Sequence, residues 1–390
     1  MTQGRGLGGA AVTVSLLIAV VVVAGCTAGV GEGTSEPTRP TGAPIATDAP
    51  TASVATAGPP GSTASSATAT AGPESVGTPV EINGQLRVCG TQLCNQFDQP
   101  IQLRGMSTHG LQWYGWGACI GDSSLDALAL DWGADIVRVS MYVQEGGYET
   151  DPDGFTAQAE TIVDALIARG LYVLLDWHML DPGDPTLNAA RAKAYFGHMA
   201  ARYGQLPNML YEIANEPSGV SWATIKAYAD DMLPVLRRDA PDGIVIIGTP
   251  AWSSFGVSEG GGPAEVAAAP VVGENVVYTF HFYAATHGQE YRDALTAASD
   301  ALPVFVTEWG AQEYTGDGAN DFDSAQAYLD LLAARKISWT SWNYSDDERS
   351  GAAFQPGTCP DGPWSGDSLK LSGAWVRDRI RNPADDFPTN

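Results

Sequence analysis

Residues 171–177 read LYVLLDW, a short and almost wholly apolar run with one charged side chain, Asp176. The run follows Thr156–Arg169, where apolar residues recur at helical spacing until Gly170 interrupts the pattern. A helix followed by a continuous apolar strand is typical of a parallel sheet, because helices cover both faces of such a sheet and bury its strands. This segment therefore predicts an α/β fold.

Seven further runs of the same kind recur along the chain, separated by stretches long enough for helices. They are Ile101–Met106, Asp135–Met141, Met209–Asn215, Gly243–Thr249, Val276–Phe282, Pro303–Glu308 and Ile337–Asn343. One of the intervening helices is predicted over Trp222–Arg238, with Ser221 as its N-cap. Eight strands alternating with helices favour a single closed (β/α)8 TIM barrel. No GxGxxG motif follows the first strand, which argues against an open dinucleotide-binding sheet.

The region before the barrel divides into two parts. Residues 10–25 are apolar and uncharged, and they end in Val23-Ala24-Gly25-Cys26, which resembles a bacterial lipobox. We therefore expect residues 1–26 to be a lipoprotein-type signal peptide and Cys26 to be lipidated; the alternative is an ordinary cleavage site beside a chance cysteine. Residues 27–79 are rich in Thr, Ala, Pro, Ser and Gly and predict a disordered linker. The barrel then occupies residues 80–390 of a secreted protein, anchored to the outer face of the cell membrane.

Without Cys26 the chain has four cysteines: Cys89, Cys94, Cys119 and Cys359. In an exported protein four cysteines most simply form two disulfides, for which three pairings are possible. Cys89 and Cys94 flank a turn in an N-terminal hairpin that begins with Gln85–Val88, so we pair them with each other and Cys119 with Cys359. A zinc site is the alternative, but the spacing does not match two CxxC motifs.

The formal net charge of the chain is −25. A surface this acidic repels phosphates, so it argues against nucleic acid or an anionic membrane surface as a partner and suits a neutral polymer. Contact with a membrane is expected only through the N-terminal lipid. No feature of the sequence indicates an oligomer, and we take a monomer as the default.

Polar residues gather where the apolar runs end, which is where (β/α)8 barrels build their active sites. Glu216 follows the fourth run and Glu308 ends the seventh. Glycosidic bond cleavage needs one carboxylic acid to protonate the leaving oxygen and one carboxylate to attack the anomeric carbon or activate water. Arg138, in the second run, is the cation expected to keep the nucleophilic carboxylate ionised. The alternative is that each glutamate caps a helix or pairs with a surface cation, which is less consistent with two of them at strand ends.

Aromatic residues also follow these runs. Trp113, Trp252 and Trp342 are predicted to stack on the apolar faces of sugar rings, although packing in the core is the usual role of tryptophan. Three of the five histidines also stand at strand ends: His109, His178 and His281. The tryptophans inside predicted helices are assigned to packing: Trp132, Trp222 and Trp375.

Asn215-Glu216-Pro217 and Thr307-Glu308-Trp309-Gly310 resemble the two catalytic signatures of glycoside hydrolase family 5. Three more motifs are similar to those of its bacterial endoglucanase subfamily, particularly actinobacterial members. They are Arg104–Trp113 (RGMSTHGLQW), Asp176-Trp177-His178 and His281-Phe282-Tyr283. The resemblance covers nearly all of residues 84–380.

The resemblance implies a role for each matching residue. Glu216 would be the acid/base and Glu308 the nucleophile, with Arg138 and Tyr283 keeping Glu308 ionised and aligned. Asn215 would hydrogen-bond the sugar 2-hydroxyl at the cleavage subsite. The remaining residues would line the cleft: His178 and His281 at the cleavage subsite, His281 near the acid/base, His109, Trp113 and Trp342 on the non-reducing side, Tyr142 beside them, and Trp252 on the leaving-group side. No metal or cofactor is implied.

The predicted activity is that of a retaining endo-β-1,4-glucanase, a glycoside hydrolase that cleaves cellulose or related β-glucans by double displacement. The two carboxyl groups should then lie about 5–5.5 Å apart. One alternative is a β-1,4-mannanase on the same frame. Alternatives from another class are a non-catalytic carbohydrate-binding surface lipoprotein with a decayed barrel and a lipoprotein adhesin.

Two further residue patterns carry expectations. Many members of the subfamily have a sugar-binding lysine after the strand-eight tryptophan, whereas this chain has Ser345-Asp346-Asp347-Glu348. That departure puts the direct contact at the distal subsite in doubt. Glu212 has the same side-chain phase as Glu216, and we expect it to be a buried partner of Arg104.

Overall fold

The computed structural model describes residues 77–113 and 115–381, in which eight parallel strands close into a barrel. The strand order is β10-β3-β4-β5-β6-β7-β8-β9, so the last strand pairs with the first. The strands are β3 (Arg104–Thr108), β4 (Ile136–Tyr142), β5 (Tyr172–His178), β6 (Met209–Glu212), β7 (Ile244–Ile247), β8 (Val276–Tyr283), β9 (Val304–Gly310) and β10 (Trp339–Tyr344). All eight predicted strands are present, and the predicted (β/α)8 barrel is confirmed.

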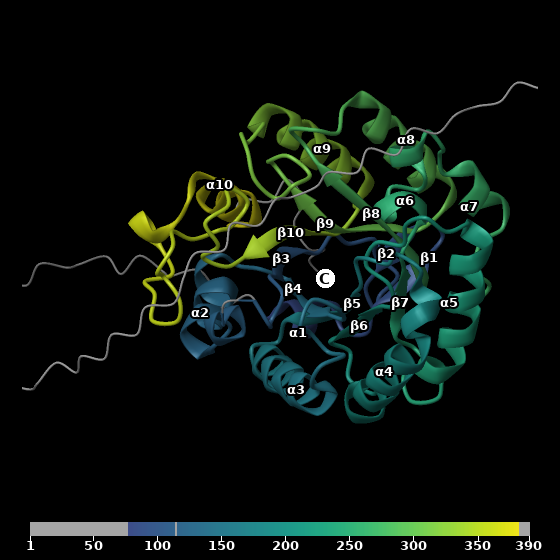
Figure 1. The fold of residues 1–390 in the computed structure, drawn as a ribbon, viewed down its shortest axis with the longest axis horizontal. Helices are drawn as coiled ribbons and strands as arrows, with labels where there is room; N and C mark the ends of the chain where they lie inside the picture. The colour runs from purple at the N-terminus through teal and green to yellow at the C-terminus, as the bar shows by residue number, and fades with distance from the viewer. Residues whose placement is uncertain (1–76, 114, 382–390) are drawn as a thin grey trace, which may run out of the picture. The chain divides into compact units, whose positions relative to one another are not determined.

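Helices surround the strands (Figure 1). The longer ones are α3 (Pro152–Ala168), α4 (Ala189–Tyr203), α5 (Trp222–Arg237), α8 (Gln289–Ala301), α9 (Phe322–Arg335) and α10 (Leu371–Arg381); the short ones are α1 (Pro79–Asn83), α2 (Asp122–Asp126), α6 (Pro250–Ser253) and α7 (Ala264–Ala268). Ser221 caps α5 as predicted, since its side chain accepts from the Thr224 backbone N–H. The α3 helix begins before the predicted Thr156, because Asp151 caps it and Pro152 starts it. Within the described residues no helix is both long and apolar enough to cross a membrane.

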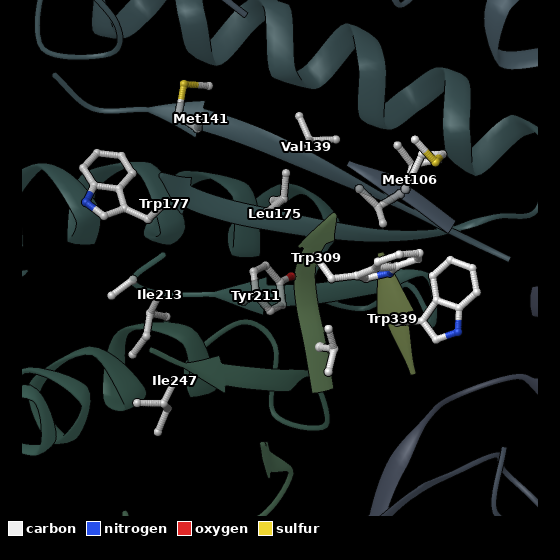
Figure 2. Packing of buried hydrophobic residues seen from close by; sticks show 14 of the residues in the cluster. Met106, Val139, Met141, Leu175, Trp177, Tyr211, Ile213, Ile247, Trp309 and Trp339 are labelled. Carbon is white, nitrogen blue, oxygen red and sulfur yellow. The ribbon is translucent and has the colours of Figure 1, made fainter. Parts of the chain in front are cut away.

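Two apolar cores hold the barrel together. The larger lies between the strands and the helices, and Figure 2 shows its strand side chains, among them Val139, Leu175 and Trp309. The smaller fills the barrel interior where the strands begin, and it includes Leu174 and Phe305. Inward-facing positions are thus apolar near the strand starts and become polar toward the strand ends.

The N-terminal hairpin closes the barrel at the end where the strands begin. It consists of β1 (Arg87–Cys89) and β2 (Gln92–Cys94), which are antiparallel and joined by the predicted Cys89–Cys94 disulfide. Leu86 and Leu93 pack into the interior core. Because this end is plugged, a ligand can reach the interior only from the end where the strands finish.

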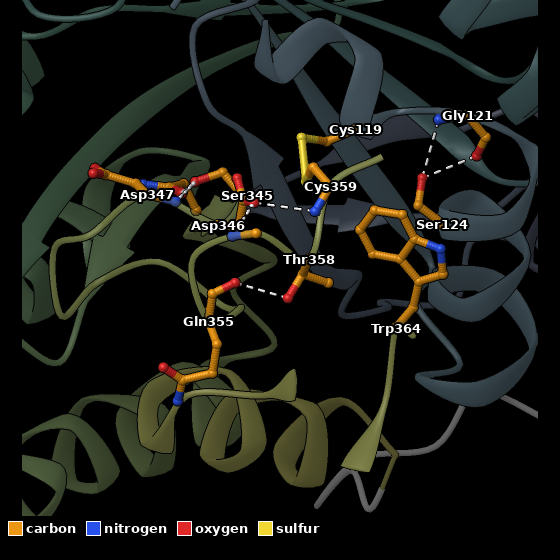
Figure 3. The surroundings of a disulfide bond; sticks show 12 residues. Cys119, Gly121, Ser124, Ser345, Asp346, Asp347, Gln355, Thr358, Cys359 and Trp364 are labelled. Carbon is orange, nitrogen blue, oxygen red and sulfur yellow. Dashed lines mark hydrogen bonds between the residues drawn. A yellow bond between two sulfur atoms is a disulfide. The ribbon is translucent and has the colours of Figure 1, made fainter. Parts of the chain in front are cut away.

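The second predicted disulfide, Cys119–Cys359, joins segments 240 residues apart in sequence (Figure 3). Cys119 follows β3 and Cys359 follows β10, so the bond links loops on either side of the seam where the barrel closes. Asp346 strengthens the link, because one of its oxygens accepts the backbone N–H groups of Gly357 and Cys359, each at 3.0 Å. Cys26, the signal peptide and nearly all of the predicted linker lie outside the described residues.

Candidate active site

A cleft of about 830 Å³ opens where the strands end. Both glutamates singled out from the sequence, Glu216 and Glu308, line it. The other lining residues are His109, Trp113, Tyr142, Glu145, His178, Leu180, Tyr283, Tyr314, Thr315, Gly316, Trp342, Asp346, Asp347, Glu348, Arg349 and Pro356. Residues from seven of the eight strand ends therefore meet in one cavity.

A bulge in β9 turns Glu308 toward the cleft. Three residue steps of β9, from Phe305 to Glu308, stand opposite two steps of β8, from Thr279 to His281. With strict alternation Thr307 would face the interior and Glu308 the helices. The extra residue lets both face the interior, and Trp309 then packs outward in the core against the helices.

Glu216 is positioned by backbone hydrogen bonds that continue the line of β6. Ile213 N–H donates to Ile246 O at 3.0 Å, and Asn215 N–H donates to Trp177 O at 3.1 Å. The segment before Glu216 is thereby held between β5 and β7. Carboxylate oxygens of Glu216 and Glu308 and a ring nitrogen of His281 lie within 4.8 Å of one another. This spacing agrees with the short separation typical of retaining glycosidases and is too small for inverting ones.

Glu308 is surrounded by donors. The hydroxyl of Tyr283 donates to Oε1 at 2.6 Å, and Arg138 Nη1 donates to Oε2 at 3.0 Å. Burial alone raises the pKa of Glu308, but the positive charges of His281 and Arg138 outweigh it, so the pKa falls below its usual value. Glu308 is therefore ionised, as a nucleophile must be.

Glu216 has a different environment. The carboxyl group of Glu216 contacts His281, whose Nδ1 lies 2.8 Å from Oε1 of Glu216. Burial and the nearby Glu308 charge raise the pKa of Glu216, and they prevail over the hydrogen bond from His281, which lowers it. Two carboxyl groups with pKa values displaced in opposite directions are suited to act as an acid and a nucleophile.

Arg138 orients Asn215. Arg138 Nη2 donates to Asn215 Oδ1 at 2.6 Å, which directs the amide nitrogen toward His178 Nε2 and Met179 O, both at 3.4 Å. His178 in turn contacts Asp176 Oδ2 through Nδ1 at 2.7 Å. Burial, together with Arg138, lowers the pKa of His178 to about 3, so this histidine is neutral. The Asn215 amide is thus fixed beside the carboxylate pair.

Four aromatic rings, those of His109, Trp113, Tyr142 and Trp342, form one wall of the cleft together with the ring of His178. Tyr142 stacks on His178 with ring centroids 4.1 Å apart, and Trp342 stacks on the same histidine at 5.2 Å. His109 lies 5.0 Å from Trp342. Trp113 completes the predicted group, 6.1 Å from His109. The structure therefore brings these sequence-predicted rings together.

Trp252 stands apart from that wall. It is 46% exposed and is absent from the cleft lining, and its backbone N–H donates to Pro217 O at 3.0 Å. That bond places Trp252 beside the segment that carries Glu216, on the acid/base side of the pair.

Sequence reasoning missed several cleft residues in loops: Glu145, Leu180, Tyr314, Thr315, Gly316, Arg349 and Pro356. Tyr314 is the aromatic residue in this set, and it is 66% exposed. The acidic segment Asp346–Glu348 lines the cleft, and Asp347 Oδ2 lies 3.8 Å from His109 Nε2. Lys370 donates to the backbone carbonyls of Asp347 and Arg349.

The predicted pairing of Glu212 with Arg104 is wrong. Arg104 begins β3 and lies 3.6 Å from Asp135, whereas Glu212 ends β6 and accepts from Arg138 Nε at 2.7 Å. Arg104 has the side-chain phase of Met106, which packs between the strands and the helices, whereas Glu212 has the phase of Leu210, which faces the barrel interior. The two side chains therefore lie on different faces of the strands, as well as at opposite ends of the barrel.

Comparisons with known proteins give the family. Residues 94–348 match the profile of the cellulase family, glycosyl hydrolase family 5. Endoglucanase E-5 of Thermobifida fusca is 61% identical over 307 residues, which cover 78% of this chain and 66% of that protein. Endoglucanase CelA of Streptomyces lividans is 52% identical, with 80% of this chain and 68% of that protein covered. The chain thus spans about two thirds of the length of each relative.

Solved structures agree with these relatives. The crystal structure of the catalytic domain of the Thermobifida fusca endoglucanase in complex with cellotetraose has a TM-score of 0.77 and 60% identity. The match covers 78% of this chain and 100% of that domain. The catalytic domain of alkaline cellulase K is 29% identical, with a TM-score of 0.71, over 80% of this chain and 97% of that one. The chain belongs to the cellulase family, glycosyl hydrolase family 5.

Proposed function

We propose that this protein is a retaining endo-β-1,4-glucanase. The observation that carries the proposal is the pair Glu216 and Glu308, with carboxylate oxygens within 4.8 Å in a cleft and pKa values displaced in opposite directions. The proposal is further supported by relatives named endoglucanases and by the cellotetraose bound to one of them.

In the first step, an oxygen of Glu308 bonds to the anomeric carbon as the glycosidic bond breaks. The proton of Glu216 passes to the departing oxygen, so the leaving sugar departs as an alcohol. In the second step, Glu216, now a carboxylate, takes a proton from water while the water oxygen attacks the same carbon. The ester bond breaks, and Glu308 returns to its carboxylate form. Two inversions give net retention at the anomeric centre.

The other site residues assist these steps. Tyr283 and Arg138 hold Glu308 ionised until it attacks, and Arg138 also orients Asn215 toward a sugar hydroxyl. The ring wall of His109, Trp113, Tyr142 and Trp342 offers flat faces to glucose units on the non-reducing side. Trp252 is assigned to the leaving-group side because of its bond to Pro217 O.

The deciding test is reducing-sugar release from soluble β-1,4-glucan, with mannan assayed in parallel. Glu308→Ala should abolish release while keeping the wild-type Tm. Proton NMR of the first products from a cello-oligosaccharide should show the β-anomer. Faster release from mannan than from glucan would favour the β-1,4-mannanase alternative. Polymer binding without release by the wild-type protein would favour the non-catalytic binding role.

We also propose that the mature protein is a monomer attached to the outer face of the membrane through lipidated Cys26. The support is the sequence Val23-Ala24-Gly25-Cys26 and the Thr/Ala/Pro-rich stretch that follows it. Wild-type protein should fractionate with membranes, and Cys26→Ser should appear in the medium or remain unprocessed. Wild-type protein found only in the medium would contradict the anchor. Sedimentation of residues 77–390 would test the monomer.

A further inference from the structure

Glu212 is a buried carboxylate that the proposed chemical steps do not use. It is fully buried and does not line the cleft, yet both of its oxygens are engaged. Oε2 accepts from Arg138 Nε at 2.7 Å, and Oε1 accepts from the hydroxyl of Thr307 at 2.6 Å. Oε1 also lies 3.7 Å from His281 Nε2. Glu212 therefore lies deeper in the barrel than Glu216 and Glu308, and its contacts lead through Thr307 to His281, the partner of the acid/base.

The hydroxyl of Thr307 fixes the direction of this connection. A hydroxyl has one proton, and Thr307 gives it to Glu212, which as a carboxylate can only accept. The contact between Thr307 Oγ1 and His281 Nε2, at 2.9 Å, must therefore be an N–H donated by the histidine. Thr279 also contacts this hydroxyl and can act as a donor to it. The arrangement requires the proton of neutral His281 to be on Nε2.

The opposite ring nitrogen then faces Glu216. Nδ1 of His281 lies 2.8 Å from Glu216 Oε1, and one proton occupies this contact. The proton is either on Nδ1, with Glu216 as a carboxylate, or on Glu216, with a lone pair on Nδ1 that accepts its hydrogen bond. The first step of the proposed mechanism needs the second arrangement, and that arrangement exists only if neutral His281 keeps its proton on Nε2.

We propose that Glu212, acting through Thr307, is a positioning residue that holds His281 in the Nε2–H form and so makes Nδ1 the proton-exchange partner of Glu216. The role extends the proposed function and rests on it. It gives a reason why the β9 bulge brings Thr307 and Glu308 to the interior together: one supports the acid/base and the other is the nucleophile.

The charge of Glu212 also bears on the pH range of activity. Burial raises the pKa of Glu212, but Arg138 and His281 outweigh it and bring the pKa to about 2, so Glu212 is ionised throughout that range. Burial lowers the pKa of His281, whereas the nearby carboxylates Glu212 and Glu216 raise the pKa to about 9. The titratable and charged groups that face this imidazole from the surrounding strands are Arg138, Asp176, His178, Glu212, Glu216 and Glu308.

The sign of the pH effect follows from that charge. A negative charge near His281 and Glu216 raises the pKa at which their shared proton is lost. Glu212→Gln removes the charge and lowers that pKa. The alkaline limb of kcat/KM reports the loss of this proton from the free enzyme, so it should move to lower pH by about 1 unit or more.

Two variants of the full chain separate the two parts of the proposal. Thr307→Val keeps the charge of Glu212 and nearly the volume of the side chain at position 307, but it removes the hydroxyl that accepts the Nε2–H of His281. Nitrogen-15 NMR of histidine-labelled protein should then show the Nδ1–H form of His281, and kcat/KM on a neutral soluble glucan should fall about tenfold or more. Glu212→Gln should displace the alkaline limb as above. Asp135→Asn is the matched control, because it removes a buried carboxylate paired with Arg104 at the other end of the barrel.

The control should lower the Tm while leaving the pH profile and the His281 tautomer unchanged. The proposal is overturned if Thr307→Val keeps the Nε2–H form, or if Glu212→Gln lowers the Tm but leaves the alkaline limb where it was. Should the wild-type protein hydrolyse no glucan, the proposed function fails. The NMR comparison of wild type with Thr307→Val still decides the tautomer in that case, so the two failures can be told apart.

Discussion

The hydroxyl of Tyr283 lies 2.6 Å from Oε1 of Glu308, while Arg138 contacts the other oxygen of the same carboxylate. The two donors come from β8 and β4, so they approach Glu308 from different sides of the barrel. A carboxylate held in this way has one ionisation state and one orientation before substrate arrives. The hydroxyl of Tyr283 can be removed by substitution with phenylalanine at little loss of volume, which makes the contribution of its hydrogen bond measurable.

Tyr283→Phe should lower kcat/KM by about 10- to 100-fold, the effect of losing a hydrogen bond of about 1.5–3 kcal/mol to a charged group. The bond lowers the pKa of Glu308, so its loss raises that pKa. The acidic limb of the pH–rate profile should therefore move to higher pH. If kcat/KM fell at every pH and the acidic limb stayed at the same pH, this account of Tyr283 would be contradicted.

Glu216→Ala should separate the two chemical steps. A substrate whose leaving group needs no protonation, such as a dinitrophenyl cellobioside, should still form the glycosyl-enzyme on Glu308. Hydrolysis of that intermediate then lacks a base, so a burst of dinitrophenol should precede slow turnover. Azide should restore turnover and yield a β-glycosyl azide, detectable by NMR. Neither burst nor azide rescue would be seen if Glu216 were not the acid/base.

The carboxylates of the cleft should discriminate against anionic polymers. Glu145, Asp347 and Glu348 line it with Arg349 as the cation among them. Repulsion between exposed charges is screened by salt, with a Debye length of about 10 Å at 0.1 M and about 30 Å at 0.01 M. Activity on carboxymethyl-cellulose should therefore rise as the salt concentration is increased from about 0.01 M to about 0.1 M. Activity on hydroxyethyl-cellulose, which is uncharged, should stay constant. Glu348→Gln should reduce the salt effect, and an equal salt response on both polymers would count against it.

The Cys119–Cys359 bond should stabilise both the barrel and one wall of its cleft. It closes a loop of 240 residues, and removing such a bond costs about 2–5 kcal/mol. A Cys119→Ser, Cys359→Ser double variant should have a lower Tm. Its KM should rise more than its kcat falls, because Asp346 and Pro356 of the linked segment line the cleft and Glu308 does not depend on it. The Cys89–Cys94 pair, at the plugged end, is the matched control and should leave KM unchanged.

The fold and the carboxylate pair were predictable because each leaves a local mark in the sequence. Strands buried on both faces must be apolar throughout, so all eight runs could be recognised. Closure of the barrel then places the polar residues at the ends of these strands in one cleft. The loops gave no such mark: Tyr314 and Arg349 belong to no periodic pattern. The partner of Glu212 could not be predicted, because a strand that is apolar on both faces does not mark which of its faces Arg104 occupies.

The bulge in β9 has a consequence for how this site can vary. The extra residue gives β9 two consecutive inward side chains, Thr307 and Glu308. Deleting one residue between Phe305 and Glu308 would restore two steps of β9 opposite two steps of β8, so Glu308 would still stand opposite His281 and face the interior. The residue before Glu308 would then face the helices, and the interior would lose the hydroxyl that contacts His281 and Glu212. The length of β9 therefore decides whether the strand can supply both a nucleophile and a support for the acid/base.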